Sequence, residues 1–98
     1  MRRVKYVISK TRRYDRDLRK IFRKNRELFI LIEDIVVRIS RDPFSTSLRT
    51  HLVVIPSLGK VYSSRVTGDI RIIWILSSKR IIVLYRIGGH SGSSKVYR

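Results

Sequence analysis

Gly68-Asp69-Ile70-Arg71-Ile72-Ile73-Trp74-Ile75-Leu76, in the last third of the chain, is the segment from which the architecture can be predicted. It is followed, after the polar residues 77–79, by Arg80-Ile81-Ile82-Val83-Leu84-Tyr85-Arg86-Ile87. Two β-rich runs with a short polar stretch between them predict an antiparallel β-hairpin. Because side chains alternate across a strand, one apolar face is expected to carry Ile70, Ile72, Trp74 and Leu76, with Ile81, Val83, Tyr85 and Ile87 beside them.

The opposite face of this hairpin is expected to carry two arginines among aliphatic side chains, namely Arg71, Ile73, Ile75, Ile82, Leu84 and Arg86. The arginines stand at the end of the hairpin remote from its turn, where Gly88-Gly89-His90 follows. A guanidinium group offers paired donors that match the oxygens of a phosphate. The sequence therefore predicts a phosphate-binding corner at the open end of the hairpin.

Composition limits the size and the partners of the protein. The 98 residues, 43% of them hydrophobic, suffice for one domain, expected to span residues 1–98. Twenty-three Lys and Arg against seven Asp and Glu give a formal charge of +16, which attracts nucleic acid or an acidic protein. The absence of cysteine excludes disulfides and thiolate chemistry and fits a reducing cytoplasm. Residues 28–37, the richest apolar run, contain Glu33 and Asp34 and are too short to span a bilayer.

The rest of the chain predicts two helices and three further strands. Helical spacing of apolar residues predicts a basic amphipathic helix from Thr11 or Arg12 to Lys24 and a second helix over residues 26–40, which Asp42-Pro43 ends. Residues 44–50 are expected to form a polar connection without a helix. Strands are predicted at residues 4–8, 51–55 and 60–66. The expected fold is α+β, in the order β-α-α-β-β-β-β: a mostly antiparallel twisted sheet with a helical hairpin on one face and Arg71 and Arg86 on the other.

Three segments resemble motifs of one family. Residues 68–74 look like the central G-D-(Y/I)-R-(I/V)-I-(Y/W) strand of the RelE/ParE superfamily of toxin–antitoxin toxins. Ile87-Gly88-Gly89-His90 with Lys95-Val96-Tyr97 is similar to the I-G-x-H … V-Y ending of RelE and YafQ-like members, and His51-Leu52 resembles the H-x-L of YafQ-like relatives. The resemblance spans essentially the whole chain. It implies a RelE-like α+β toxin, bound by an acidic antitoxin, that cuts mRNA in the ribosomal A site.

The resemblance also implies roles for individual residues. Asp69, His90 and Tyr97 match positions that YafQ-like toxins use for cleavage or for substrate positioning, and His51 matches a further functional histidine. Arg71 matches the arginine that RelE-like members use against the scissile phosphate. Arg65 stands where YafQ-like relatives have a histidine. Two departures from the family pattern are the longer spacing between His90 and Tyr97 and the sequence of residues 53–57, which replaces a Gly-containing loop.

The residue chemistry agrees with metal-independent RNA cleavage, which needs a base for the 2′-hydroxyl, an acid for the leaving oxygen and positive charge at the phosphate. His90 is the candidate acid or base, because its unperturbed pKa lies near neutrality. Tyr97 is expected to stack on a base or to transfer a proton, and Asp69 to orient an arginine or a histidine. The expected RNA-binding residues are Arg65, Arg86, Lys60, Arg12, Arg13, Arg16 and Lys95. Two distant histidines predict no metal site, and no cofactor is expected.

The leading hypothesis is therefore a cytoplasmic toxin that acts as a ribosome-dependent mRNA endoribonuclease, with an acidic antitoxin, mRNA and the ribosome as partners and with no membrane association. One alternative is a ParE-like toxin that inhibits DNA gyrase and performs no chemistry on RNA. The other is an inactive relative that only binds nucleic acid, which the two departures from the family pattern leave open. The fold alone does not separate these three functions.

Overall fold

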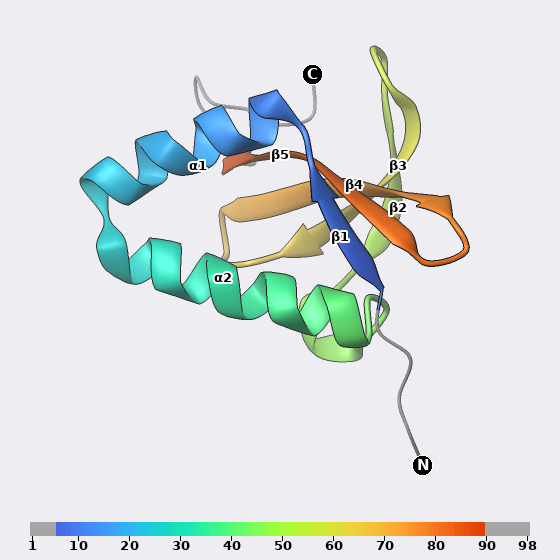
Figure 1. Ribbon diagram of the computed structural model, residues 1–98, viewed down its shortest axis with the longest axis horizontal. Helices are drawn as coiled ribbons and strands as arrows, with labels where there is room; N and C mark the ends of the chain where they lie inside the picture. Colours follow the sequence, from blue (N-terminus) through green and yellow to red (C-terminus); the bar gives the residue numbers. More distant parts are fainter. Residues whose placement is uncertain (1–5, 90–98) are drawn as a thin grey trace.

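The structure, a computed structural model, describes residues 6–89. Its elements follow the predicted order (Figure 1). They are β1 (Val7–Lys10), α1 (Arg12–Lys24), α2 (Arg26–Arg41), the 3-10 helix η1 (Thr46–Leu48), β2 (His51–Ile55), β3 (Gly59–Arg65), β4 (Ile70–Ser78) and β5 (Ile81–Gly89). The expectation that residues 44–50 contain no helix was wrong, because η1 turns the chain so that Leu48 is fully buried. β1 continues to Lys10, two residues beyond its predicted end.

The five strands form one sheet in the order β1-β5-β4-β3-β2. β1 pairs with β5 in parallel, and the other three pairings are antiparallel. The predicted hairpin of residues 70–87 is thus the pair β4–β5 at the centre of the sheet. α1 and α2 lie on one face of the sheet (Figure 1), which confirms the predicted α+β architecture. Within residues 6–89, no helix combines the length and the hydrophobicity that a membrane-spanning helix needs.

Two polar side chains define the helical hairpin. Thr11 precedes α1, and its Oγ1 accepts a hydrogen bond from the Tyr14 amide at 3.0 Å. Asn25 both ends α1 and begins α2, since its amide donates to the Ile21 carbonyl while its Oδ1 accepts from the Leu28 amide. Its extended backbone, with φ of −153°, interrupts the helical path. These caps satisfy amides that a helix start leaves without intrahelical partners.

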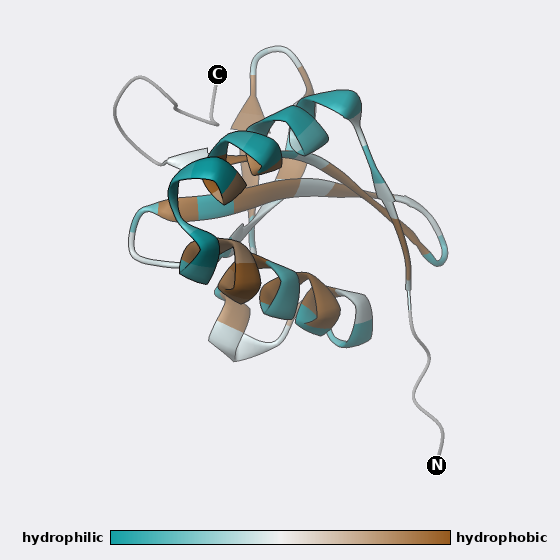
Figure 2. Ribbon diagram, turned by 60° about the vertical axis from the view of Figure 1, so that its left-hand side comes forward, coloured by the Kyte–Doolittle hydropathy of each residue, from teal (hydrophilic) through white to brown (hydrophobic). Residues whose placement is uncertain are grey.

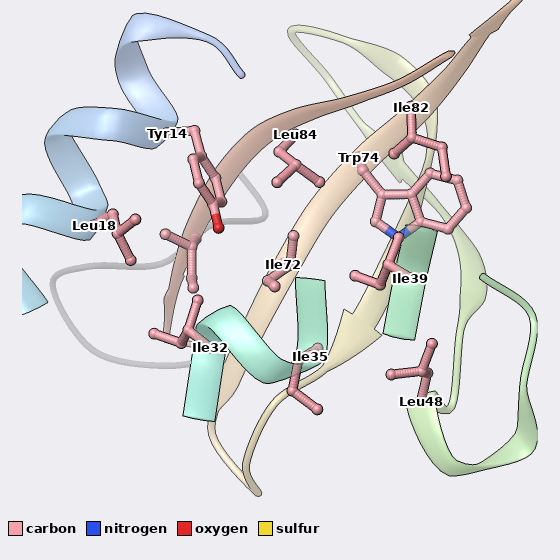
Figure 3. Packing of buried hydrophobic residues seen from close by; sticks show 11 residues of the cluster. Tyr14, Leu18, Ile32, Ile35, Ile39, Leu48, Ile72, Trp74, Ile82 and Leu84 are labelled. Carbon is pink, nitrogen blue, oxygen red and sulfur yellow. The ribbon is translucent and has the colours of Figure 1, made fainter. Parts of the chain in front are cut away.

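The main core lies between the helices and the sheet. The apolar faces of both helices turn toward the strands (Figure 2), and their buried side chains interlock with those of β4 and β5 (Figure 3). The buried members are Tyr14, Leu18, Ile32, Ile35, Ile39, Leu48, Ile72, Trp74, Ile82, Leu84 and Ile87. Trp74, which the sequence predicted to be core, is fully buried and donates from Nε1 to Ser64 Oγ at 2.8 Å.

The predicted assignment of β5 side chains to the two faces was wrong over most of the strand. Ile82 and Leu84 face the helices, whereas Tyr85 packs against a second, smaller cluster of Ile55, Val61 and Ile73 on the other face. The cause is a β-bulge: Ile73 pairs with Arg86, but its neighbour Trp74 pairs with Leu84, so Tyr85 has no position opposite it. One extra residue in a strand reverses the alternation on one side of the bulge.

Candidate functional site

Two rows of residues cross the sheet on the face away from the helices. Residues directly opposite each other on paired strands share a face. The first row consists of Arg65, Arg71 and Gly88, and the second row of His51, Ser63, Ile73 and Arg86. Ile73, buried in the second cluster, identifies this as the helix-free face, as predicted for Arg71 and Arg86. Since neighbouring strands lie about 4.8 Å apart, the second row spans about 14 Å.

The turn before β4 holds the two arginines of the first row. Thr67 Oγ1 accepts hydrogen bonds from the amides of Asp69 (3.2 Å) and Ile70 (3.0 Å), which closes the turn. The carbonyl oxygen of Thr67 accepts from Arg71 Nη1 at 2.6 Å and from Arg65 Nε at 3.3 Å. Both arginines are half-buried. One carbonyl therefore fixes two guanidinium groups on neighbouring strands, which is a suitable arrangement for binding a phosphate.

His51 begins the edge strand β2 and is exposed. Its Nδ1 lies 3.0 Å from the carbonyl oxygen of Arg49, a residue with a left-handed backbone (φ 48°). A carbonyl only accepts hydrogen bonds, so this contact requires the proton on Nδ1. In the neutral ring the other nitrogen, Nε2, is then the one that can accept a proton.

The remaining predicted site residues are spread more widely. Asp69 is exposed in the turn before β4, beside the arginines of the first row. Lys60 lies opposite Val54 at the far end of β3, and its position in the strand places it on the other face from Arg65. The structure does not bring Lys60 together with Arg65 and Arg71, the pair that forms the arginine corner. His90, Lys95 and Tyr97 lie outside the described residues, so their predicted roles stay predictions.

A basic pocket of about 670 Å³ lies between helix α1, the start of α2 and the ends of β4 and β5. Five cationic side chains contribute to its wall, namely Arg13, Arg16, Lys20, Lys24 and Arg86. Of the predicted RNA-binding residues on α1, Arg13 and Arg16 line this pocket, whereas Arg12 does not contribute to it. Arg86 belongs both to this pocket and to the second row of the helix-free face. It therefore joins the two basic surfaces.

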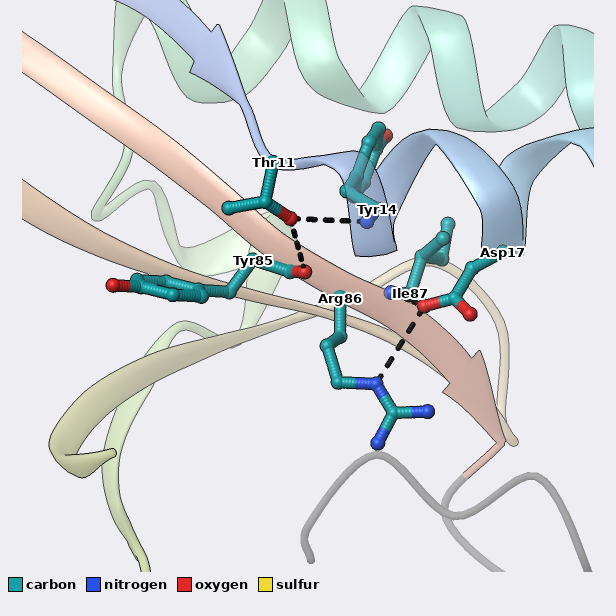
Figure 4. Close-up of polar contacts among 6 residues, drawn as sticks. All are labelled: Thr11, Tyr14, Asp17, Tyr85, Arg86 and Ile87. Atoms are coloured by element: carbon teal, nitrogen blue, oxygen red, sulfur yellow. Dashed lines mark hydrogen bonds and ion pairs between the residues drawn. The ribbon is translucent and has the colours of Figure 1, made fainter. Parts of the chain in front are cut away.

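Arg86 is held from α1 by Asp17 (Figure 4). Asp17 Oδ2 lies 3.6 Å from Arg86 Nε and accepts a hydrogen bond from the Ile87 amide at 3.2 Å. A neighbouring contact ties the same two elements together, since Thr11 Oγ1 donates to the carbonyl oxygen of Tyr85 at 2.8 Å. The start of α1 is thus fixed to the second half of β5, which β1 does not pair with.

The sequence reasoning missed two residues that organise the site, Thr67 and Asp17. The signal for Thr67 is its place in a Thr-Gly-Asp turn, where a hydroxyl commonly bonds to amides two and three residues on. The signal for Asp17 is weaker: it is an acidic residue within a strongly basic helix. Within residues 6–89, no three His, Cys, Asp or Glu side chains come together in a way that could hold a metal ion.

Known proteins resemble this chain in structure rather than in sequence. No protein-family model matches it, and no curated protein matches it significantly. A YoeB/ParE toxin from Agrobacterium tumefaciens matches with a TM-score of 0.72 at 16% identity, covering 87% of this chain and 99% of that one. The RelBE2 toxin–antitoxin complex from Mycobacterium tuberculosis matches with 0.69 at 19% identity, covering 88% and 92%. YafQ from E. coli matches with 0.63 at 14% identity, covering 86% and 92%.

The chain has the RelE/ParE toxin fold. The three matches cover nearly the whole length of each matched chain. The resemblance expected from the strand motifs is confirmed at this level. In this RelE-like fold the β4 motif of residues 68–74 supplies Arg71 on one face and Ile72 and Trp74 on the other. The alternation of side chains along β4 thus places Arg71 on the helix-free face and the two apolar residues in the core.

Proposed function

We propose that this protein is the toxin of a type II toxin–antitoxin system and that it cleaves mRNA on the ribosome, which stops translation. The observation that carries the proposal is the pair Arg65 and Arg71, held by one carbonyl on the helix-free face. Like charges placed directly opposite each other on paired strands are destabilising. Such a pair is explained by a ligand with negative charge, and a phosphate of RNA fits both the charge and the geometry.

In the proposed reaction the arginines stabilise the charge that develops on the phosphate when the 2′-hydroxyl attacks it. Arg71 and Arg65 supply this charge from the first row, and Arg86 adds to it from the second. His51 Nε2 is the described group that can accept a proton. His90 and Tyr97 are the further residues proposed for proton transfer and for stacking on a base, and Asp69 for orienting an arginine or a histidine. No metal or cofactor is needed for this chemistry.

An acidic antitoxin is the proposed protein partner. The chain has a net charge of +16, and the solved structure of RelBE2, which has the same fold, is a toxin–antitoxin complex. A cytoplasmic location follows from the proposed substrate, because translating ribosomes are there. The basic stripe of α1, which contains Arg12, Arg13 and Arg16, is proposed to contact ribosomal RNA through its phosphates.

Primer extension on mRNA translated in vitro, with and without ribosomes, tests the proposal. The native chain is expected to produce cuts that require ribosomes. Substitution R71A is expected to reduce the rate of cleavage by roughly 100-fold or more, which is typical for the loss of a group that stabilises charge in a transition state. K79A is the charge-matched control, because Lys79 is exposed at the turn between β4 and β5, at the other end of the same hairpin.

Two other outcomes would replace the proposal. Inhibition of DNA supercoiling by gyrase, without any RNA cleavage, would establish the gyrase-directed function instead. RNA binding that weakens with salt, without product in the presence of ribosomes, would establish an inactive binding protein. Equal cleavage by the native chain and R71A would exclude the arginine corner as the site of the reaction.

A further inference from the structure

The ion pair between Asp17 and Arg86 places a carboxylate in a part of the protein that is otherwise strongly basic. Asp17 is one of seven acidic residues in the chain, and it stands in a pocket wall that carries five cations. Its side chain is 13% exposed and that of Arg86 is 18% exposed. Placing a carboxylate out of water is costly unless it is paired. Here it is paired twice, with the Arg86 guanidinium and with the Ile87 amide.

The contact also fixes the direction of the guanidinium group. Asp17 Oδ2 approaches Arg86 at Nε, and the ion pair drawn in Figure 4 runs to this atom rather than to either Nη atom. A guanidinium group has five N–H donors in a rigid plane, so an ion pair at Nε restricts the directions in which its Nη donors point. Arg13, Arg16, Lys20 and Lys24, on the same pocket wall, repel Arg86. The carboxylate of Asp17 offsets this repulsion and keeps the guanidinium at the strand.

We infer that Asp17 is a positioning residue for the proposed RNA cleavage: it holds the Arg86 guanidinium at the junction of the basic pocket and the helix-free face, so that its Nη donors meet the substrate phosphate. The inference rests on the proposed function for its effect on the reaction, but the hold on Arg86 is a property of the folded chain. Asp17 itself touches no substrate. Its second contact, with the Ile87 amide, fixes the backbone of β5 next to Arg86, where β1 gives no pairing.

Substitution D17N separates the two contacts. The asparagine Oδ1 still accepts from the Ile87 amide, whereas the negative charge beside Arg86 is lost. We expect D17N to lower the thermal midpoint, because Arg86 loses its partner. At a temperature where D17N is folded, we expect kcat for ribosome-dependent cleavage to fall roughly 10- to 100-fold, with KM within about threefold, since misplacing a catalytic group mainly slows the chemical step. D34N is the matched control: Asp34 pairs with Arg38 at 3.7 Å on the exposed surface of α2, and its loss is expected to leave kcat unchanged.

A double-mutant cycle shows whether Asp17 acts through Arg86. In an R86A background, D17N is expected to cause no further loss of kcat, because the group that it positions is gone. A loss of the same size in both backgrounds would overturn the inference, and so would a native kcat in D17N. D17E provides a further check: its longer side chain keeps the charge and is expected to restore part of the lost kcat.

A readout without RNA distinguishes failure of this inference from failure of the proposed function. The Nε–Hε resonance of Arg86, assigned by its absence in R86K, is expected to be protected from solvent exchange in the native chain and at least tenfold less protected in D17N. The Nε–Hε resonance of Arg38 is expected to show the same solvent exchange in the native chain and in D17N. If the native chain cleaves no RNA, the proposed function fails, and this protection still decides whether Asp17 holds Arg86. Unchanged protection in D17N would overturn the inference.

Discussion

Arg65 and Arg71 lie directly opposite each other on β3 and β4, and both donate a hydrogen bond to the carbonyl oxygen of Thr67, at 3.3 Å and 2.6 Å. The pairing places two positive charges side by side on a half-buried surface. A fold selected for stability alone would separate them, because like charges directly opposite on a sheet are destabilising. The arrangement is accounted for if a negative ligand binds between the two guanidinium groups.

The first prediction concerns this pair. R65Q is expected to raise the thermal midpoint slightly or to leave it unchanged, since it removes the repulsion while the glutamine amide can still donate to Thr67. RNA binding is expected to weaken. The slope of log K against log salt is expected to become shallower by about the amount that one phosphate contact contributes. Filter binding of a short RNA over a salt series measures both quantities, with K79Q as the charge-matched control. A marked loss of stability in R65Q would show that the pair is structural.

The second prediction concerns Thr67, whose hydroxyl closes the turn that presents the arginines. T67A removes the acceptor of the Asp69 and Ile70 amides, which is expected to cost about 1 kcal/mol of unfolding free energy. T67S keeps the hydroxyl and is expected to lose much less. Because the Thr67 carbonyl binds both arginines, T67A is also expected to slow RNA cleavage more than its stability loss explains. Denaturant unfolding and single-turnover cleavage at a temperature where both variants are folded separate the two effects.

The sequence predicted the order of the elements and the face of Arg71, because those depend on local patterns. The amphipathic periods of α1 and α2 and the alternation in β4 are readable in the sequence. The sequence did not predict which β5 side chains face the helices, since alternation alone assigns Tyr85 to the core side. The bulge at Tyr85 depends on how β4 and β5 pair, and it places Leu84 beside Trp74 instead. No count along a single strand reveals such a register shift.

The candidate site also contains residues that the sequence predicts and one that only the packing of distant segments reveals. Arg65, Arg71 and His51 were predicted from their residue types and from the family resemblance, and the strand pairing places them on one face of the sheet. Asp17 was missed because it lies 69 positions before Arg86, and only the packing of α1 against the second half of β5 brings the two side chains together. A residue that acts by holding another is identified by a contact between distant segments, which composition and spacing do not contain.

The third prediction concerns a chain of hydrogen bonds on the face of the sheet that the helices cover. Ser64 Oγ accepts from Trp74 Nε1 at 2.8 Å and lies 2.7 Å from Thr50 Oγ1, which donates to the Pro43 carbonyl. S64A leaves the buried indole N–H without its acceptor, which is expected to cost about 1–3 kcal/mol of unfolding free energy. Denaturant unfolding followed by the fluorescence of Trp74 measures it. S77A, at an exposed position on β4, is the control. A cost in S64A no larger than in S77A would contradict the role of this chain.

The last prediction concerns the phenol of Tyr14. The Tyr14 side chain is fully buried, and its hydroxyl makes no hydrogen bond within residues 6–89. Burial raises the pKa of Tyr14 well above its ordinary value of about 10, and the carboxylates of Glu33, Asp15 and Asp17 raise it further. Y14F removes a hydroxyl without a partner, so the unfolding free energy near pH 7 is expected to stay unchanged or to rise by about 1 kcal/mol.

The raised pKa also makes the stability depend on pH in a predictable direction. The folded chain keeps the Tyr14 proton, whereas the unfolded chain releases it above about pH 10. The contribution of Tyr14 is therefore fully present below that pH and is lost as the pH rises, at up to about 1.4 kcal/mol per pH unit. Y14F lacks this group, so its advantage over the native chain is expected to grow from pH 9 to 11.5. Parallel stability curves over that range, measured by denaturant unfolding, would contradict a neutral phenol in the core.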